Sequence, residues 1–281
     1  MLVTVYITTF NRLELLKRAI DSVLSQTYSP IELIVADDGS TDGSQQYLKG
    51  LHDQGILIAI LNISGRSKGA CYGRNKAISL ARGEFISGLD DDDYFEPWRI
   101  ETFIKKWQEY TVNKKVFSAL FDSVVEHRKS GPVACYDIKV ATYQKLRKGN
   151  VVGNQVFTKT SYLKAVGGFD EQMPALQDWD TWLRLSNQYG DILNVNSRSY
   201  IQIQNHEGER ITGKPAEKIR FAFNRLMNKL QPLTRSEESH LLSTMYGGYP
   251  QTDIRISELL KIFMGGHFRK VAQVVKRTLL K

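Results

Sequence analysis

Four consecutive aspartates, Asp90–Asp93, follow the apolar segment 84–89 and precede an aromatic stretch that contains Pro97. Neighbouring carboxylates repel one another, so such a run costs free energy unless a cation neutralises it. Mg²⁺ is suited to this, because it binds through few protein carboxylates and completes its shell with water and phosphate oxygens. A solvated acidic loop would explain many acidic runs. The position directly after an apolar segment favours a site for a metal and a diphosphate.

A second acidic pair, Asp37 and Asp38, ends the apolar segment 31–37 within "VADDGSTDGS". A capped turn accounts for the residues that follow, with Ser40 or Thr41 as the expected helix cap. Two adjacent carboxylates are more than a turn needs. One of them is therefore expected to accept a hydrogen bond from a base or a ribose.

The segment "TTFNR" (8–12) follows the first apolar stretch of the chain. Asn11 is expected to cap the helix that comes next. Thr8 and Phe10 are then available to line a pocket. A plain strand-to-helix connection explains this segment equally well.

The elements that must position these residues alternate along the first half of the chain. Strands are expected at 2–8, 31–37, 56–62 and 84–89, and helices at 13–26, 38–48 and 69–83. This βαβαβαβ order implies parallel strands with helices on both faces of the sheet. Ligands bind beyond the carboxyl ends of such strands, so the three polar clusters are expected at one sheet edge.

The second half of the chain is less regular. Strands are expected at 115–127, 132–143 and 191–204, the first two partly antiparallel. The segment 151–171 predicts a strand, a short helix and a Gly-Gly turn. The segment 177–190 predicts a helix that carries Asp178 in its first turn.

Five segments, in this order and spacing, resemble the successive motifs of inverting family 2 glycosyltransferases with the GT-A fold. They are "VTVYITTFNR", "SVLSQTYSPIELIVADDGSTDGS", "GRNKAISLARGEFISGLDDDD", "GGFDE" and "QDWDTWLRL", and they fall between about residues 3 and 210. The resemblance implies an α/β fold with a Rossmann-like mixed sheet flanked by helices. The expected catalytic domain is 1–212, with a nucleotide-binding half at 1–98 and an acceptor-binding half at 99–212. A basic, mainly helical extension is expected at 213–281.

The resemblance also implies roles on the donor side. The residues that match nucleotide-binding positions are Thr8, Phe10, Asp38, Arg74, Asn75, Asp90 and Asp91, with Asp38 pairing the uracil N3–H. Pro97 sets the register of the family pattern Asp-x-Asp-Asp-x-x-x-Pro. Asp90 and Asp92 then form the Asp-x-Asp pair, and Asp92 is the expected ligand of Mn²⁺ or Mg²⁺. Asp91 stands in the variable position and is expected to be the most replaceable of the run.

On the acceptor side, Asp178 matches the family's general base, with Gln177 where glutamate is usual and Asp180 as the second candidate. His206 and Arg210 are candidates for contact with the diphosphate or the metal. The implied reaction is a metal-dependent, inverting transfer of a hexose or N-acetylhexosamine from a UDP-sugar to a hydroxyl of a glycan. The expected acceptor is a lipid-linked oligosaccharide or a lipopolysaccharide or capsule precursor.

Two other functions share some of these features. A sugar nucleotidyltransferase should carry a Gly-rich basic loop after its first strand, and "TTFNRLELL" contains no glycine. A non-catalytic nucleotide-sugar-binding subunit of a glycan assembly complex could have lost Asp178. The presence of Asp178 favours an enzyme.

The net charge of +8 lies entirely in the C-terminal quarter of the chain. Residues 1–212 hold 25 basic and 25 acidic residues, whereas residues 213–281 hold 13 basic and 5 acidic ones. Segments 217–230 and 268–281 predict amphipathic helices, the second with an apolar face formed by Phe268, Val271, Ala272, Val275 and Leu279. Residues 217–281 either pack on the catalytic domain or bind an anionic membrane surface. Nucleic acid is not expected as a partner, because no binding motif accompanies the charge.

Other features of the sequence bear on where the protein works. The apolar runs fall short of the roughly 20 residues that cross a bilayer, and the N-terminal segment lacks the features of a signal peptide. Cys71 and Cys135 are expected to be thiols in a reducing compartment. The expected location is the cytoplasm, with peripheral attachment to the cytoplasmic face of the membrane if the extension binds lipid.

Overall fold

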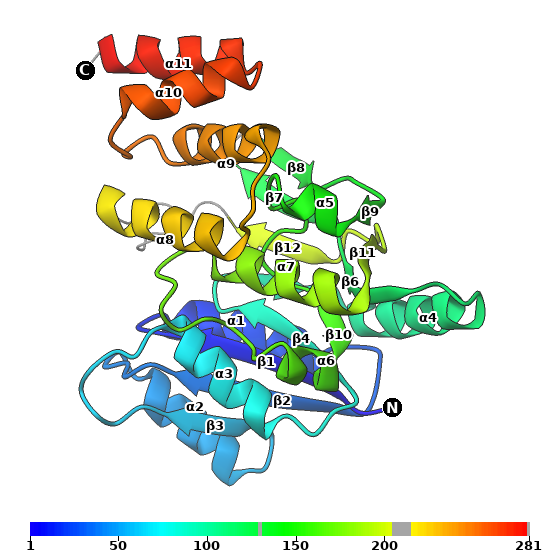
Figure 1. Cartoon of the computed structure of the whole chain (residues 1–281). Coiled ribbons are helices and arrows are strands. Elements are labelled where there is room, and N and C mark those ends of the chain that lie inside the picture. Colours follow the sequence, from blue (N-terminus) through cyan, green and yellow to red (C-terminus); the bar gives the residue numbers. More distant parts are fainter. Residues whose placement is uncertain (129–130, 204–214, 280–281) are drawn as a thin grey trace.

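The first half of the chain alternates between strands and helices, as predicted. The computed structural model describes residues 1–128, 131–203 and 215–279. Its first elements are β1 (Val3–Thr9), α1 (Leu13–Leu24), β2 (Ile31–Asp37), α2 (Ser44–Asp53), β3 (Ile58–Leu61), α3 (Ala70–Leu80) and β4 (Phe85–Asp90). β3, β2, β1 and β4 are parallel neighbours in that order (Figure 1). The predicted alternation of strands and helices in this half, and the parallel direction of its strands, are confirmed.

Side chains of β1 alternate between two hydrophobic clusters on opposite faces of the sheet. Val5 packs in the cluster that contains Ile20 of α1, whereas Tyr6 packs in the cluster that contains Ile78 of α3. A parallel strand that is covered on both faces must be apolar at nearly every position. This explains why the strand segments are continuous apolar runs rather than alternating ones.

The second half of the chain extends the same sheet with shorter strands. These are β6 (Phe117–Phe121), β9 (Val140–Ala141), β10 (Phe157–Lys159) and β11 (Asp191–Asn194). The full order is β3-β2-β1-β4-β10-β6-β11-β9, and β10 runs antiparallel to both β4 and β6. The result is the mixed sheet flanked by helices that the sequence predicted.

A second sheet lies beside the first, and it corrects the strand assignment at 115–127 and 132–143. It contains β5 (Tyr94–Phe95), β12 (Tyr200–Ile203), β7 (Val124–Arg128) and β8 (Gly131–Cys135) in that order. Each predicted strand is therefore two strands in different sheets. Between β6 and β7, Asp122 accepts hydrogen bonds from the backbone N–H groups of Arg198 and Ser199 at 2.9 and 2.7 Å. At this point the chain leaves the eight-stranded sheet after β6 and enters the four-stranded sheet as β7.

The remaining helices lie along the second half of the chain and beyond it. They are α4 (Arg99–Val112), α5 (Tyr143–Leu146), α6 (Thr160–Ala165), α7 (Gln177–Tyr189), α8 (Ala216–Lys229), α9 (Arg235–Gly248), α10 (Ile256–Met264) and α11 (Phe268–Leu279). α8 to α11 stack one on another and lead away from the eight-stranded sheet (Figure 1). Within the described residues, none of these or the other helices is long and apolar enough to span a bilayer.

α8 joins the extension to the catalytic core. Ile219, Phe223 and Leu226 are fully buried in the cluster that also holds Trp179 of α7. The rings of Trp179 and Phe223 meet edge to face, with centroids 6.1 Å apart. Packing of this helix on the catalytic domain is thus confirmed. The domain boundary at residues 212 and 213 lies outside the described residues and stays a prediction.

Candidate functional site

The polar clusters predicted from the sequence meet at the carboxyl edge of the parallel strands. Thr8 of β1 lies in register with Ala36 of β2 on one side and with Asp90 of β4 on the other. Asp38 follows β2, and its backbone N–H donates to the carbonyl of Thr9 at 3.0 Å. Phe10 is half exposed beside them. The position of these residues at one edge follows directly from the pairing of the strands.

Hydrogen bonds tie the loops at this edge to one another and correct the predicted helix caps. The residue that caps α1 is distant in sequence, because Asp42 accepts from the backbone N–H of Leu13 at 2.8 Å. Asn11 instead accepts from the N–H of Thr41 at 2.8 Å. α2 begins at Ser44 after Gly43, later than predicted. The two strand-end loops therefore act as one framework for the site.

The four aspartates have different partners. Arg12 lies on two of them, with Nη1 at 3.0 Å from both Asp91 Oδ1 and Asp92 Oδ2. Asp90 is held by Arg74 at 3.1 Å. Asp93 accepts from the hydroxyl of Tyr200 at 2.8 Å. Arginine side chains thus supply part of the neutralising charge that the acidic run requires.

Asp91 is not the most replaceable residue of the run, which corrects the expectation from its variable position. Only 5% of the residue is exposed. Thr9 Oγ1 donates to its carboxylate at 2.7 Å, in addition to the contact with Arg12. Burial raises the pKa of Asp91 to about 6, although Arg12 and Thr9 act in the opposite direction. Because it is buried and hydrogen-bonded, Asp91 holds the loop in place.

Asp90 lies in a network of amide side chains that the sequence did not reveal. Gln155 Nε2 donates to Asp90 Oδ1 at 2.9 Å, and Asn154 Nδ2 donates to Oδ2 at 2.8 Å. A Cβ on Gly88 would lie only 1.9 Å from Gln155 Oε1. Glycine at position 88 therefore leaves the space in which Gln155 reaches the carboxylate.

Asp93 is buried beside two other carboxylates of the run. Burial, followed by the charges of Asp90 and Asp92, raises its pKa well above its usual value. Asn154 Nδ2 also donates to the hydroxyl of Tyr200, at 3.0 Å, and so helps to orient that hydroxyl. Asp93 and Tyr200 thus form the buried part of the hydrogen-bond network beneath the acidic run.

Asp38 clamps the loop that follows β3. Its carboxylate accepts from Ser67 Oγ at 2.5 Å and from the backbone N–H groups of Lys68 and Gly69, each at 2.8 Å. Burial favours the neutral form, but these hydrogen bonds outweigh it and lower the pKa of Asp38. The predicted contact with uracil therefore requires an oxygen of Asp38 to accept a further bond or the loop to shift.

Asn75 has a positioning role in the structure. Its Nδ2 donates to the carbonyl of Phe169 at 2.8 Å and its Oδ1 accepts from the N–H of the same residue at 2.8 Å. Nδ2 also donates to Glu171 at 2.9 Å. Asn75 thus holds the "GGFDE" segment against α3, because its amide group both donates and accepts hydrogen bonds with that segment.

Gly168→Ala is expected to destabilise the fold more than Gly167→Ala. Both glycines have positive φ, +80° at Gly167 and +62° at Gly168, so each alanine costs about 1–2 kcal/mol. A Cβ at 168 would lie 2.4 Å from Asn75 Oδ1, whereas a Cβ at 167 meets nothing within 4 Å. Loss of the Asn75 bonds adds about 1–3 kcal/mol. Urea unfolding of both variants measures the difference; equal losses would mean that Asn75 does not clamp the segment.

Asp178 lies in the first turn of α7, within the electrostatic range of Arg74. Burial raises its pKa to about 6, although the Arg74 guanidinium and the backbone N–H of Trp179 favour the charged form. Arg74 is itself buried, pairs with Asp90, and has an Nε atom with no hydrogen-bond partner among the described residues. One guanidinium thus lies within the electrostatic range of both the acidic run and the candidate base.

Two tyrosines from distant segments lie near Asp178. Burial, and then the charge of Asp178, raises the pKa of Tyr136 and of Tyr249 to about 12. Tyr249 ends α9 and its ring meets that of Phe223 with centroids 5.8 Å apart, next to the contact between Phe223 and Trp179. The C-terminal extension therefore contributes a side chain to the surroundings of the candidate base.

Comparisons with known proteins identify the family of the chain. The family model described as glycosyl transferase family 2 matches residues 4–160, more than half of the chain. The chain belongs to glycosyl transferase family 2. WcaA of Escherichia coli (strain K12), a glycosyl transferase named for colanic acid biosynthesis, is 34% identical over 248 residues, which are 87% of each chain.

A second sequence relative shares less of the chain, and a solved structure shares its fold. WfaP of Escherichia coli, named as a UDP-Glc:alpha-D-GlcNAc-diphosphoundecaprenol beta-1,3-glucosyltransferase, is 33% identical over 125 residues, or 44% of this chain and 47% of that one. Among solved structures, TarS 1-349 of S. aureus in complex with UDP-GlcNAc superimposes with a TM-score of 0.67. It covers 93% of this chain and 78% of its own at 18% identity. This likeness shows the GT-A fold of the glycosyltransferase.

Asp180, the second candidate for the base of this glycosyltransferase, is engaged elsewhere. It is buried, and its carboxylate accepts from Arg184 Nη2 and from Lys229 Nζ, each at 2.8 Å. Lys229 and Arg225 of α8 also bind Asp170, each at 2.7 Å. Asp180 therefore belongs to a network of ion pairs that joins α7 to α8.

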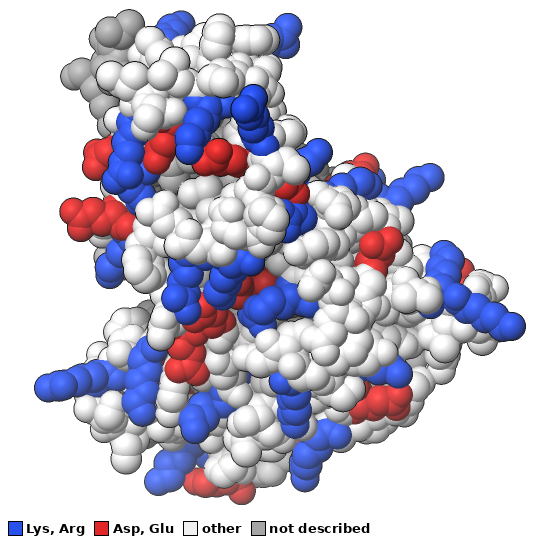
Figure 2. All heavy atoms as spheres, viewed as in Figure 1, with Lys and Arg blue, Asp and Glu red and all other residues white. Residues whose placement is uncertain are grey.

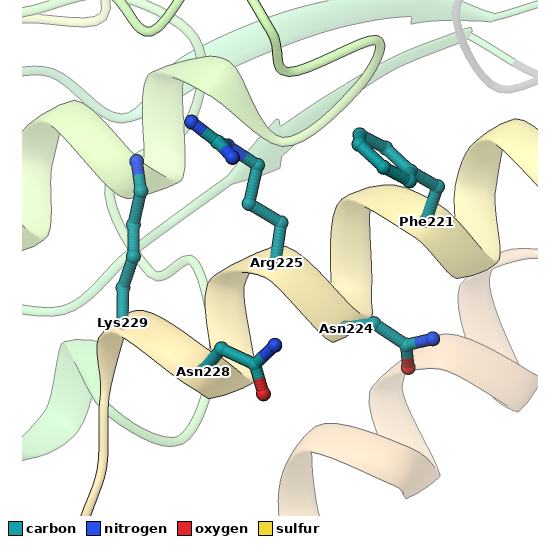
Figure 3. Close-up of a pocket in the computed structure, with 5 residues that line it drawn as sticks. All are labelled: Phe221, Asn224, Arg225, Asn228 and Lys229. Carbon is teal, nitrogen blue, oxygen red and sulfur yellow. The ribbon is translucent and has the colours of Figure 1, made fainter.

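A pocket of about 480 Å³ lies along α8 (Figure 3). It is lined by Phe221, Asn224, Arg225, Asn228 and Lys229. Phe221, Arg225 and Lys229 project from one side of the helix, and the two asparagines project from the other. Phe221 offers an apolar ring on one side of the helix, and the asparagines offer hydrogen-bonding groups on the other.

The residues of the acidic run fit a hard divalent cation. Carboxylate oxygens are the donors that Mg²⁺ and Mn²⁺ prefer, and part of Asp92 remains accessible to solvent. Among the described residues, no group of three or more acidic, histidine or cysteine side chains forms a ready-made metal cage. This arrangement suits an ion that takes one or two carboxylates from the protein and its other ligands from a diphosphate.

The described site differs from the predicted one in two ways. His206 and Arg210 lie outside the described residues. Sequence reasoning missed four side chains that hold the acidic run, namely Arg12, Asn154, Gln155 and Tyr200. Arg12 was visible in "TTFNR", since a basic residue that follows a strand end is placed to meet carboxylates at the neighbouring strand end.

Proposed function

We propose that this glycosyltransferase moves a hexose or N-acetylhexosamine from a UDP-sugar to a hydroxyl of a glycan, with inversion and with a divalent metal. The observation that supports the proposal most is the position of Arg74. Its guanidinium pairs with Asp90 of the acidic run and acts electrostatically on Asp178. A candidate base and a candidate diphosphate site are thus neighbours, as a single displacement requires.

On the donor side, Phe10 and Thr8 line the base and ribose, and Asp38 reads the uracil. Arg74 has a buried Nε whose hydrogen is available to a phosphate oxygen. Asp92 holds the metal, with Asp90 on the nucleotide side. When bound, a divalent ion neutralises charge on the departing diphosphate as a Lewis acid. Arg74 and the ordered amide network around Asp90 supply positioned charge before the reaction, which is usually the largest catalytic contribution.

On the acceptor side, Asp178 takes the proton of the acceptor hydroxyl. The acceptor oxygen forms a bond to the anomeric carbon as the bond from that carbon to UDP breaks on the opposite face. One displacement of this kind inverts the configuration at the anomeric carbon. A pKa near 6 leaves Asp178 mostly ionised at neutral pH, yet more basic than an ordinary carboxylate. Tyr136 and Tyr249 limit the access of water.

The proposed acceptor is a lipid-linked glycan of polysaccharide biosynthesis. The names of WcaA and WfaP, which refer to colanic acid and to a diphosphoundecaprenol acceptor, support this class. The pocket on α8, with Phe221 and its amides, offers a site for a further sugar of the acceptor. The proposed location is the cytoplasmic face of the membrane; Cys71 and Cys135 form no disulfide, in agreement with a reducing compartment.

A panel of nucleotide sugars tests the donor and the metal together. We expect slow release of UDP from one or more UDP-sugars in the presence of Mn²⁺, and its loss when EDTA replaces the metal. GDP-mannose and ADP-glucose serve as matched controls for the base. Hydrolysis of a GDP-sugar alone, or hydrolysis that is unchanged by EDTA, would contradict the proposed donor or the proposed cofactor.

A further inference from the structure

α10 is apolar on two faces, and the described residues cover only one of them. Ile262 is fully buried and Leu259 packs against the core. On the other face, Ile256, Leu260, Phe263 and Met264 are 78, 56, 50 and 73% exposed. Their spacing places them along one side of the helix. A contiguous exposed apolar face of this kind marks an interaction site, so it calls for a partner outside the described chain.

α11 enlarges the same surface. The ring of Phe268, which is 57% exposed, meets that of Phe263 with centroids 4.8 Å apart. Val274 is the residue of α11 that faces the core, and Val271 packs beside it. The face of α11 that packs on the core therefore differs from the predicted apolar face. Phe268, Ala272 and Val275 of the predicted face remain exposed. We refer to Ile256, Leu260, Phe263, Met264 and Phe268 as the distal apolar patch.

Exposed basic side chains flank the distal apolar patch in sequence. Arg255 precedes the patch in sequence, Arg269 follows it, and Lys276 lies two turns further along α11; all three are exposed. The extension as a whole carries 13 basic and 5 acidic residues. Figure 2 shows this end of the molecule as a largely uncharged surface with Lys or Arg side chains at its outer edge. Exposed apolar groups flanked by positive charge are typical of a surface that binds at a membrane interface.

We propose that the distal apolar patch inserts into the interface of an anionic lipid bilayer, with Arg269 and Lys276 on the headgroup phosphates. A second copy of the chain is the other occupant that an apolar face could take. A symmetric pairing would bring two strongly basic extensions together, and their repulsion opposes it, whereas anionic lipid attracts them. The inference deepens the proposed function by naming the surface that faces a lipid-linked acceptor, but its test requires no catalytic activity.

Flotation of the full chain with lipid vesicles tests the proposal. We expect binding to vesicles of phosphatidylglycerol and phosphatidylcholine, and much weaker binding to phosphatidylcholine alone. Leu260→Gln/Phe263→Gln is expected to lower the partition coefficient about a hundredfold, because two apolar side chains lose their burial. Arg269→Gln/Lys276→Gln is expected to lower it about thirtyfold at low salt.

Matched controls come from exposed residues elsewhere. Val112→Gln/Val116→Gln changes two valines that are 80 and 81% exposed, and Lys49→Gln/Lys148→Gln removes two exposed charges. Both are expected to bind vesicles as the parent does. Equal binding by the patch variants and their controls would overturn the proposal. The proposal would also be overturned if light scattering showed that the parent is a dimer and that only Leu260→Gln/Phe263→Gln abolishes the dimer. Failure of UDP-sugar hydrolysis alone would affect the proposed function and leave the vesicle result standing.

Discussion

Asp178→Asn is expected to lower kcat by about 10²–10⁴-fold while UDP-sugar binding stays unchanged. Asparagine keeps the shape of the side chain in the first turn of α7 but does not accept the acceptor's proton. The same variant is expected to lose the pH dependence of the parent. In the parent, kcat/KM rises as pH increases through about 6, because burial places the pKa of Asp178 there and only the ionised form acts as a base. Initial rates across pH 5–8 with a saturating acceptor measure both effects.

Asp180→Asn is the matched control for this prediction. Asp180 lies two residues further along α7 and is bound by Arg184 and Lys229. Its replacement removes the partner of a buried ion-pair network, so it should destabilise the fold while the pH profile keeps its limb near 6. A catalytic rate in Asp178→Asn close to that of the parent would refute Asp178 as the base.

Asp92→Ala is expected to abolish transfer and to remove the part of UDP affinity that depends on metal. Calorimetry with UDP, in Mn²⁺ and in EDTA, should give a large difference for the parent and for Asp178→Asn. It should give almost none for Asp92→Ala, because the carboxylate that links metal and diphosphate is gone. Equal nucleotide affinity of all three proteins in Mn²⁺ would contradict the proposal that Asp92 binds the metal and Asp178 does not.

The ion pair with Arg12 complicates that experiment, and a further variant separates the effects. Asp92→Ala removes a carboxylate and also releases one contact of Arg12. Arg12→Gln releases the same contact and keeps the carboxylate. If metal binding depends on Asp92 itself, Arg12→Gln retains the effect of Mn²⁺ on UDP affinity.

The first half of the fold was predictable because each strand and its following helix are adjacent in sequence. The periodicity of each segment then identifies the element, and the parallel order follows from the length of the connections. The second half depends on pairings between distant and very short strands. β9 has two residues and pairs with β11, fifty residues away. The break between β6 and β7 depends on hydrogen bonds from Arg198 and Ser199 to Asp122, which no local pattern indicates.

The same distinction applies to the site. Thr8, Asp38 and Asp90 were placed correctly because strand ends of a parallel sheet lie together. Asn154 and Gln155 reach Asp90 from the segment before β10, sixty-five residues away, and neutral amides give no charge pattern that would reveal them. The contacts of Asp91 were not foreseen for a related reason, since its partners Thr9 and Arg12 come from another strand end.

The contact between Phe223 and Trp179 has a practical consequence for anyone who shortens this protein. Trp179 follows Asp178 directly, and its ring is covered by α8, while Tyr249, which follows α9, covers Phe223. A deletion that begins before α8 would remove the packing behind the helix turn that carries Asp178, so activity would be lost for reasons unrelated to the membrane. The proposed lipid binding is therefore better tested with point substitutions on the outer helices than with a series of shortened chains.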